Sequence, residues 1–252
     1  MDLQLADTPC LVTGASTGIG AAIAAALAAE GARVAITARR LELLDRVADA
    51  IAAAGHPRPV PVAADLTAPD GPARVADAAT AALGHVAVLV NNMGNARPTT
   101  WDAPEEAWAE GWTLNFDAAR RLTTLLLPAM IARQWGRIIN LTGTSEPAGT
   151  NAAIPAKMAT IAWGKGLAKD LGRHGITVNG IGPARIKSEQ ALTRLYPDPA
   201  AREAFAKARI PVGYFGEPED LAVFAAFLAS PRARYINGEN VNLDGGMRMF
   251  TF

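Results

Sequence analysis

A glycine-rich turn lies near the start of the chain, at Thr13-Gly14-Ala15-Ser16-Thr17-Gly18-Ile19-Gly20. It follows a short apolar run and opens a segment with helical spacing, so it predicts a strand, a tight turn and a helix. Glycines in such a turn let the backbone approach a pyrophosphate, whose charge meets the N–H groups and dipole of the helix N-terminus. We therefore expect dinucleotide binding by Gly14, Ser16, Thr17, Gly18, Ile19 and Gly20.

On both sides of this turn, short apolar runs alternate with longer segments of helical period. This alternation is typical of repeated βαβ units, and runs without a polar face indicate strands covered on both sides. Strands are expected at residues 10–13, 34–37, 60–63, 86–90, 137–141, 177–181 and 240–243, with helices including 20–30, 41–54 and 161–172. The predicted fold class is α/β: a Rossmann-like doubly wound parallel sheet with helices on both faces.

Length and composition indicate one domain, residues 1–252. Lys and Arg number 24, as do Asp and Glu, so no net charge attracts nucleic acid or a membrane surface, and neither is an expected partner. The single Cys10 cannot form an intrachain disulfide, and no signal or membrane-spanning segment is recognised. The expected location is the cytoplasm.

The spacing of the glycines resembles that of the short-chain dehydrogenase/reductase family, and other segments extend the resemblance over nearly the whole chain. Asp65-Leu66 is similar to the family's acidic residue on the adenine side, and Asn91-Asn92-Met93-Gly94 to its Asn-Asn-Ala-Gly strand end. Asn115 is similar to a helix asparagine that holds a proton-relay water. Pro183-Ala184-Arg185-Ile186-Lys187-Ser188 resembles the element that grips the nicotinamide carboxamide, and Asp244-Gly245-Gly246 the C-terminal signature. The resemblance implies cofactor contacts by Asp65, Leu66, Asn92, Gly94, Pro183, Ile186 and Ser188.

The choice of dinucleotide depends on the end of the second predicted strand, which reads Thr37-Ala38-Arg39-Arg40. An acid there would accept hydrogen bonds from the adenosine ribose, whereas arginine can bind a 2′-phosphate. Arg39 and Arg40 therefore favour NADP(H) over NAD(H), although Arg40 is equally well explained as a solvated residue at the start of a helix.

The resemblance also implies a catalytic set that is incomplete in this chain. Lys157 matches the family lysine, which binds the nicotinamide ribose and lowers the pKa of a tyrosine four residues before it; that position holds Ala153. The family serine falls on Gly143, and the loop that follows is shorter than usual, so Thr144 or Ser145 could supply the hydroxyl. The expected catalytic residues are Asn115, Ser145 and Lys157.

Three features leave alternatives open. Tyr196 lies in an irregular segment, residues 186–216, that is either a substrate lid or a surface excursion. From a lid it could deliver the missing proton; otherwise water or Lys157 itself would supply it. Tyr214 and Tyr235 are expected in structural roles. Trp101 either lines a substrate pocket or packs. Since the sequence contains no cluster of His, Cys and carboxylate residues at ligand spacing, no catalytic metal is expected.

Two functions remain. The first is an NADP(H)-dependent oxidoreductase that acts on a small carbonyl or alcohol substrate with an altered proton donor. The second is a cofactor-binding family member without turnover, which serves as a redox-state sensor or partner subunit. The resemblance and the apolar helices at residues 122–131 and 161–171 also predict a homo-oligomer, a dimer or homotetramer.

Overall fold

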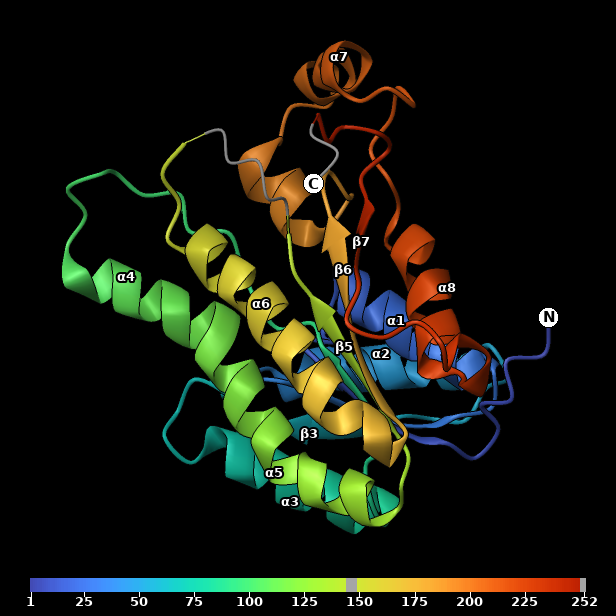
Figure 1. Cartoon of the computed structure of the whole chain (residues 1–252). Coiled ribbons are helices and arrows are strands. Elements are labelled where there is room, and N and C mark those ends of the chain that lie inside the picture. Colours follow the sequence, from blue (N-terminus) through green and yellow to red (C-terminus); the bar gives the residue numbers. More distant parts are fainter. Residues whose placement is uncertain (144–148, 250–252) are drawn as a thin grey trace.

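The computed structural model describes residues 1–143 and 149–249 (Figure 1). Within these ranges seven parallel strands form one sheet in the order β3-β2-β1-β4-β5-β6-β7. The strands are β1 (Pro9–Thr13), β2 (Arg33–Ala38), β3 (Val60–Ala63), β4 (Val88–Asn91), β5 (Gly136–Leu141), β6 (Ile176–Pro183) and β7 (Asn240–Leu243). The strand order reverses between β1 and β4, which opens a crevice at their carboxyl ends.

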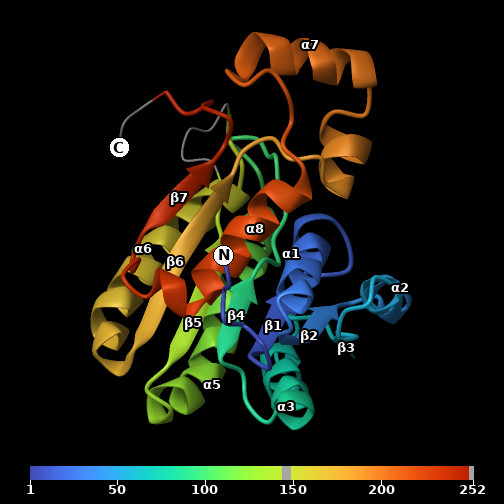
Figure 2. The ribbon, with the colours of Figure 1, turned by 90° about the vertical axis from the view of Figure 1, so that its right-hand side faces the viewer.

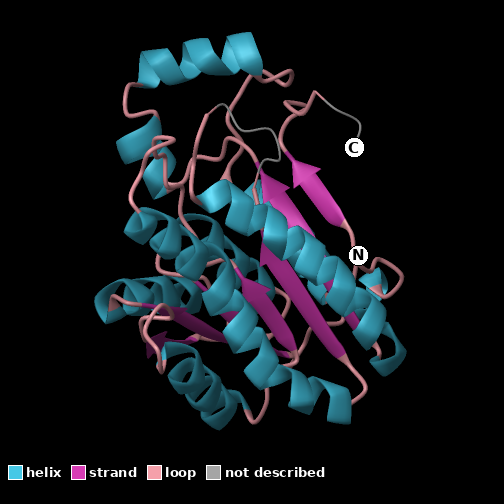
Figure 3. Ribbon diagram, turned by 60° about the vertical axis from the view of Figure 1, so that its left-hand side comes forward, coloured by secondary structure: helices cyan, strands magenta, loops and turns pink. Residues whose placement is uncertain are grey.

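Helices cover both faces of this sheet, as Figures 1 and 3 show. One face carries α1 (Gly18–Ala29), α2 (Leu41–Ala53) and α8 (Pro218–Ala229). The other carries α3 (Gly71–Leu83), α5 (Ala118–Ala132) and α6 (Ala153–Leu171). A π-helix at Thr113–Asp117 joins α4 (Glu105–Trp112) to α5. The predicted fold class is confirmed.

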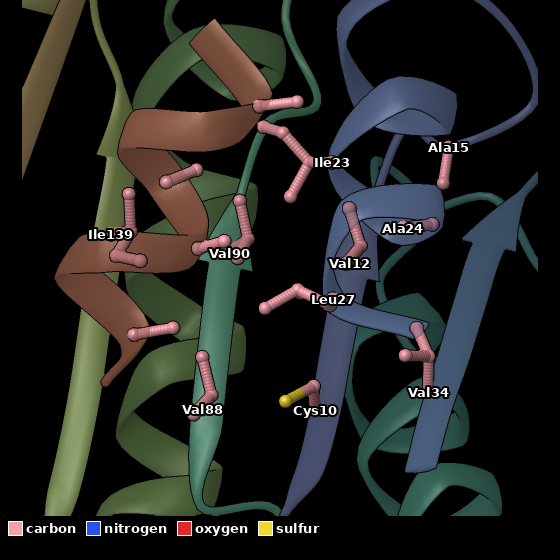
Figure 4. Packing of buried hydrophobic residues seen from close by; sticks show 14 of the residues in the cluster. Cys10, Val12, Ala15, Ile23, Ala24, Leu27, Val34, Val88, Val90 and Ile139 are labelled. Atoms are coloured by element: carbon pink, nitrogen blue, oxygen red, sulfur yellow. The ribbon is translucent and has the colours of Figure 1, made fainter. Parts of the chain in front are cut away.

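Alternate side chains of the central strands enter two separate cores. Cys10 and Val12 pack with α1, α2 and α8, whereas Leu11 between them packs toward α3 and α5. Figure 4 shows part of the first core, where Ile23 and Leu27 of α1 lie over the sheet. Both faces are buried because βαβ crossovers place helices on each side, which explains why these strands lack a polar face.

Helix α6 begins at Ala153, so the predicted start at residue 161 is wrong. Pro155 is the third residue of the helix, and in the first turn a backbone N–H has no partner within the helix. The proline therefore fits without breaking the helix. Asn151 Oδ1 accepts a hydrogen bond from Ala153 N at 2.9 Å and helps to start it.

Residues 186–216 contain more regular structure than an irregular segment would. A π-helix at Ala191–Leu195 is followed by α7 (Pro199–Arg209), which stands beyond the carboxyl ends of the strands (Figure 2). Ala206, Ile210 and Phe215 form a small core of its own, with Tyr196 and Phe205 packed against it. In the described part of the chain, none of the helices combines the length and apolar character needed to cross a bilayer.

Candidate active site

One cavity of about 1070 Å³ runs along the carboxyl ends of the strands. It extends from Arg39 and Arg40 after β2, past the glycine turn, to Lys157 on α6 and Arg185 after β6. The sequence-predicted site residues that line it are Gly14, Ser16, Thr17, Gly18, Ile19, Arg39, Arg40, Asp65, Leu66, Asn92, Gly94, Lys157, Pro183, Ile186 and Ser188. Residues from distant parts of the sequence therefore meet in one space.

The glycine turn is held in place by the loop after β4. Thr13 Oγ1 accepts hydrogen bonds from Asn92 N and Met93 N, both at 3.0 Å. Asn92 Nδ2 donates in return to the carbonyls of Thr13 and Gly14, at 3.0 Å each. Gly14 and Gly18 have φ values of 63° and 56°, which side chains rarely adopt. These hydrogen bonds fix the shape of the turn, and the N-terminus of α1 faces the cavity, which Gly18 and Ile19 line.

Two arginines and two carboxylates lie at the adenine end. Arg39 makes no hydrogen bond or ion pair with a described residue, and Arg40 lies 4.0 Å from Glu189. The hydroxyl and amide of Thr67, together with the nearby charge of Arg39, hold the pKa of the Asp65 carboxyl below its usual value. Asp65 is thus ionised but engaged by Thr67, while the Arg39 guanidinium is available to an anion.

Lys157 lies at the opposite end and has no carboxylate partner within residues 1–143 and 149–249. Its Nζ donates to the carbonyls of Leu141 at 3.2 Å and Thr142 at 2.8 Å. Burial lowers its pKa from 10.5 to about 8, because a charged ammonium loses hydration there. At neutral pH the amine is protonated, yet close enough to its pKa to give up the proton.

Ala153 also lines the cavity, one helical turn before Lys157 and on the same face of α6. Gly143 lies beside the lysine: a Cβ built there would be 3.1 Å from Lys157 Cδ. Thr142 cannot supply a free hydroxyl, since Oγ1 bonds Ile181 O at 3.1 Å and Asn240 Oδ1 at 2.8 Å. Ser145 and Thr144 lie outside the described residues, so the expected role of Ser145 stays a prediction.

Two predicted site residues support the cavity without lining it. Asn115, in the π-helix, is buried; its Oδ1 accepts from Asn95 N at 3.0 Å and its Nδ2 donates to Gly111 O at 2.9 Å. Gly94 permits the close approach of this group and Lys157, because a Cβ there would be 2.9 Å from Asn115 Oδ1 and 3.2 Å from Lys157 Nζ. Gly20 packs against Asn92 and the backbone of Gly14.

The sequence did not single out two arginines that line the substrate end. Arg97 pairs with Glu110 at 2.7 Å, and Arg185 projects from the motif after β6. Arg185 had a signal, its place within the Pro183–Ser188 element, but a motif does not say where a side chain points. Arg97 had none.

The aromatic expectations need correction. Trp101 is 87% exposed and is absent from the cavity wall, so it neither lines the pocket nor packs in the core of its own chain. Tyr235, expected in a structural role, is 100% exposed, and Tyr214 is 62% exposed. Tyr196 lines the cavity, with its ring centroid 5.0 Å from that of Phe205. Composition alone does not show which side of a loop faces solvent.

A family model described as "Enoyl-(Acyl carrier protein) reductase" matches residues 14–248. The chain belongs to the short-chain dehydrogenase/reductase family. This dehydrogenase/reductase is 35% identical over 251 residues to the 3-oxoacyl-[acyl-carrier-protein] reductase of Vibrio cholerae, covering 98% of this chain and 100% of that protein. The expectation of membership in a family of NAD(P)-dependent oxidoreductases is confirmed.

Solved structures agree with this dehydrogenase/reductase assignment. An L-sorbose reductase from Gluconobacter frateurii, complexed with NADPH and L-sorbose, has a TM-score of 0.93 and 31% identity and covers 99% of this chain and 100% of its own. A 7α-hydroxysteroid dehydrogenase complexed with NADH and 7-oxo glycochenodeoxycholic acid has a TM-score of 0.92 and 29% identity, covering 100% and 98%. The shared fold therefore accommodates either dinucleotide.

The cavity of this family member fits a dinucleotide. A pyrophosphate needs close backbone approach, and the turn at Gly14 and Gly18 provides it beside the first N–H groups of α1. The cavity volume, about 1070 Å³, slightly exceeds the usual range for small-molecule sites, ~300–1,000 Å³. No group of three or more His, Cys, Asp or Glu residues that could hold a metal ion occurs in residues 1–143 or 149–249.

Proposed function

We propose that the protein is an NADP(H)-dependent oxidoreductase that reduces a small carbonyl compound or oxidises the corresponding alcohol, without a tyrosine as proton donor. The observation that carries this proposal is the continuous cavity that joins Arg39 at one end to Lys157 at the other. A protein that only sensed the adenosine end would not need an amine of altered pKa at the far end. We also propose that the protein is located in the cytoplasm, as the sequence leads us to expect.

The preference for NADP(H) rests on Arg39 and Arg40. Arg39 has no hydrogen-bond acceptor among the described residues, and a 2′-phosphate would give it charge-assisted bonds. Glu189 is the only carboxylate within 4.0 Å of Arg40 among these residues, and both side chains are more than half exposed. A phosphate can therefore compete for Arg40 as well.

Carbonyl reduction adds a hydride to carbon and a proton to oxygen. When bound, the reduced nicotinamide supplies the hydride. Lys157 is the proton source we propose: burial lowers its pKa to about 8, and two of its three N–H bonds are held by Leu141 O and Thr142 O. The third can donate to the carbonyl oxygen directly or through a water, and the neutral amine then recovers its proton from solvent. Ala153 leaves room for that water.

The segment 186–216 belongs to this proposal as the substrate lid. Tyr196 and Leu195 line the cavity, and the lid has its own small apolar core beneath α7. We also propose that the protein forms a homo-oligomer, either a dimer or a tetramer.

Calorimetric titration with NADPH and NADH tests the cofactor. We expect wild type to bind NADPH several-fold more tightly, and Arg39→Ala to lose this preference. Arg46→Ala is the matched control, because Arg46 is an exposed arginine of α2 outside the cavity. Equal affinities of wild type for the two nucleotides would overturn the NADP(H) preference.

Turnover separates the two functions. NADPH oxidation is followed over a panel of ketones and aldehydes with wild type and Lys157→Ala. Reduction by wild type that falls 10²-fold or more in the variant is expected for a positioned acid, for which about 10²- to 10⁴-fold is usual. Tight NADPH binding without turnover of any carbonyl would instead support the second candidate, a non-catalytic cofactor-binding subunit, which Ala153 favours.

A further inference from the structure

Arg185 is a cation at the substrate end of the cavity and has no counter-charge among the residues that the structure describes. It follows β6 and lines the cavity, and its guanidinium makes no hydrogen bond or ion pair with a described residue. Its Nε is buried and has no acceptor. A buried donor without a partner is destabilising, and native proteins rarely keep one without a reason.

The guanidinium is nevertheless held in place. Its Cζ lies 5.5 Å from the ring centroids of both Tyr196 and Phe205. The backbone is fixed as well, since Gly216 N donates to Arg185 O at 2.9 Å. Aromatic faces attract a cation but leave its N–H donors free. Arg185 is thus oriented by contacts that do not use its hydrogen bonds.

Of the four other cations that line the cavity, three contact described residues and the fourth, Arg39, lies at the adenine end. Arg97 pairs with Glu110 at 2.7 Å, and Arg40 lies 4.0 Å from Glu189. Lys157 donates to two carbonyls. The charge of Arg39 acts on Asp65, at the adenine end. Among the described residues, Arg185 is therefore the cation at the substrate end that lacks both a carboxylate and an acceptor.

We infer that the substrate carries a carboxylate, which Arg185 binds through paired N–H donors while Lys157 faces the reacting carbonyl. This inference rests on the proposed function and narrows its substrate class to oxo acids or hydroxy acids. A planar guanidinium can bind a carboxylate through two parallel hydrogen bonds. Its contacts with two aromatic rings already restrict the side chain, so less conformational freedom is lost on binding. A neutral ketone would leave the guanidinium without a counter-charge among the described residues.

The test uses a series of oxo acids, from 2-oxobutanoate to 5-oxohexanoate, and the methyl ester of each. Binding is measured by calorimetry in the presence of saturating NADP⁺, and turnover with NADPH is measured separately. We expect at least one acid to bind wild type about 10- to 100-fold more tightly than its ester, as charge-assisted hydrogen bonds allow. Arg185→Gln should remove this difference without changing the affinity for the ester.

Two further variants serve as controls. Arg194→Gln removes an exposed arginine of the same segment that does not line the cavity, and it should keep the preference for the acid. Arg185→Lys keeps the charge without the paired donors and should restore part of the preference. If circular dichroism shows that Arg185→Gln does not fold, the preference for acid over ester is compared between Arg185→Lys and wild type instead.

The results distinguish this inference from the proposed function. Failure to bind NADPH, or lack of turnover, counts against the proposed function, whereas acid binding in the NADP⁺ complex is scored independently. Equal binding of acid and ester by wild type would overturn the inference. So would unchanged acid binding in Arg185→Gln, or an equal loss of NADPH affinity in that variant, which would assign Arg185 to the cofactor phosphates.

Discussion

Single side chains decide the chemistry of the substrate end, and Ala153 is the most consequential of them. It is buried, lines the cavity and lies one turn from Lys157. A tyrosine placed there would share the helix face of the lysine. The neighbouring Gly143 is also compatible with a larger residue, because a Cβ would meet only the flexible stem of Lys157, at 3.1 Å.

We expect Ala153→Tyr to raise the rate of reduction of 3-oxo esters by ~10-fold or more, because a positioned phenol adds an acid at a position where Ala153 supplies none. Gly143→Ser should increase the gain further. Initial rates of NADPH oxidation are compared for wild type, the tyrosine variant and the double variant. Ala153→Phe, which adds the ring without the hydroxyl, is the matched control. A fast wild type and a slower tyrosine variant would show that another donor occupies this space.

The lowered pKa of Lys157 predicts how stability depends on pH. The pKa is about 8 in the folded protein and about 10.4 in an unfolded chain. Between these values the unfolded state binds more protons, so the free energy of unfolding rises with pH and the cost of the buried charge, present below about pH 8, disappears. The full shift corresponds to ~3 kcal/mol, which cavity water reduces to roughly 1–2 kcal/mol.

Urea unfolding of wild type and Lys157→Met at about pH 7.5 and about pH 10 measures this effect. Between these two pH values, the free energy of unfolding of wild type should rise by roughly 1–2 kcal/mol relative to that of the variant. Lys169→Met replaces an exposed lysine of the same helix, and its free energy of unfolding should change with pH as that of wild type does. Parallel curves for wild type and Lys157→Met would mean that the amine keeps an ordinary pKa.

At the scale of elements, the cavity depends on how closely helix α1 joins the strand ends. A Cβ on Gly20 would lie 2.5 Å from Asn92 Nδ2 and 2.5 Å from the carbonyl oxygen of Gly14. The amide can move, but the carbonyl belongs to the turn that faces the phosphates. Gly20 therefore supports the cofactor site from outside the cavity by letting α1 start against this turn.

Gly20→Ala should lower the free energy of unfolding by roughly 1–3 kcal/mol, as overpacking usually does. It should also weaken NADPH binding, because the Gly14 carbonyl must shift. Gly166→Ala is the control: nothing lies within 4 Å of its Cβ position in α6, and alanine there should stabilise by about 0.5–1 kcal/mol. Urea midpoints and NADPH titrations report both effects. Unchanged NADPH affinity in Gly20→Ala would contradict this account of the turn.

At the scale of the whole molecule, apolar side chains remain on the outside of the helical layer that carries α5. Leu125 on α5 is 49% exposed and Trp112 on α4 is 37% exposed. Single exposed apolar residues are ordinary on a monomer. Together with the family, they lead us to expect that this layer is partly covered by a second subunit.

Light scattering at micromolar concentration should therefore give a mass that is a multiple of 26.3 kDa. Leu125→Asp should shift the mass toward one subunit, because a charge would lose its hydration in an apolar interface. Leu41→Asp places the same charge at an exposed leucine of α2 and should leave the mass unchanged. A wild-type mass near 26 kDa would contradict the prediction.

The sequence by itself determined the order of the strands along the chain, the glycine turn and most of the residues that line the cavity around that turn. These depend on local patterns: apolar runs buried on both faces, and glycines that accept positive φ at residues 14 and 18. The same patterns misplaced the start of α6, which begins at Ala153 and tolerates Pro155 in its first turn.

Only the tertiary structure decided which side chains meet at the substrate end. Arg185 follows β6 but contacts Phe205 on α7, and Arg97, in the loop after β4, reaches Glu110 on α4. Likewise Lys157 loses hydration because α6 packs beside the end of β5, and Trp101 stays in solvent. Direction and burial of a side chain are set by elements distant in sequence, so no local pattern encodes them.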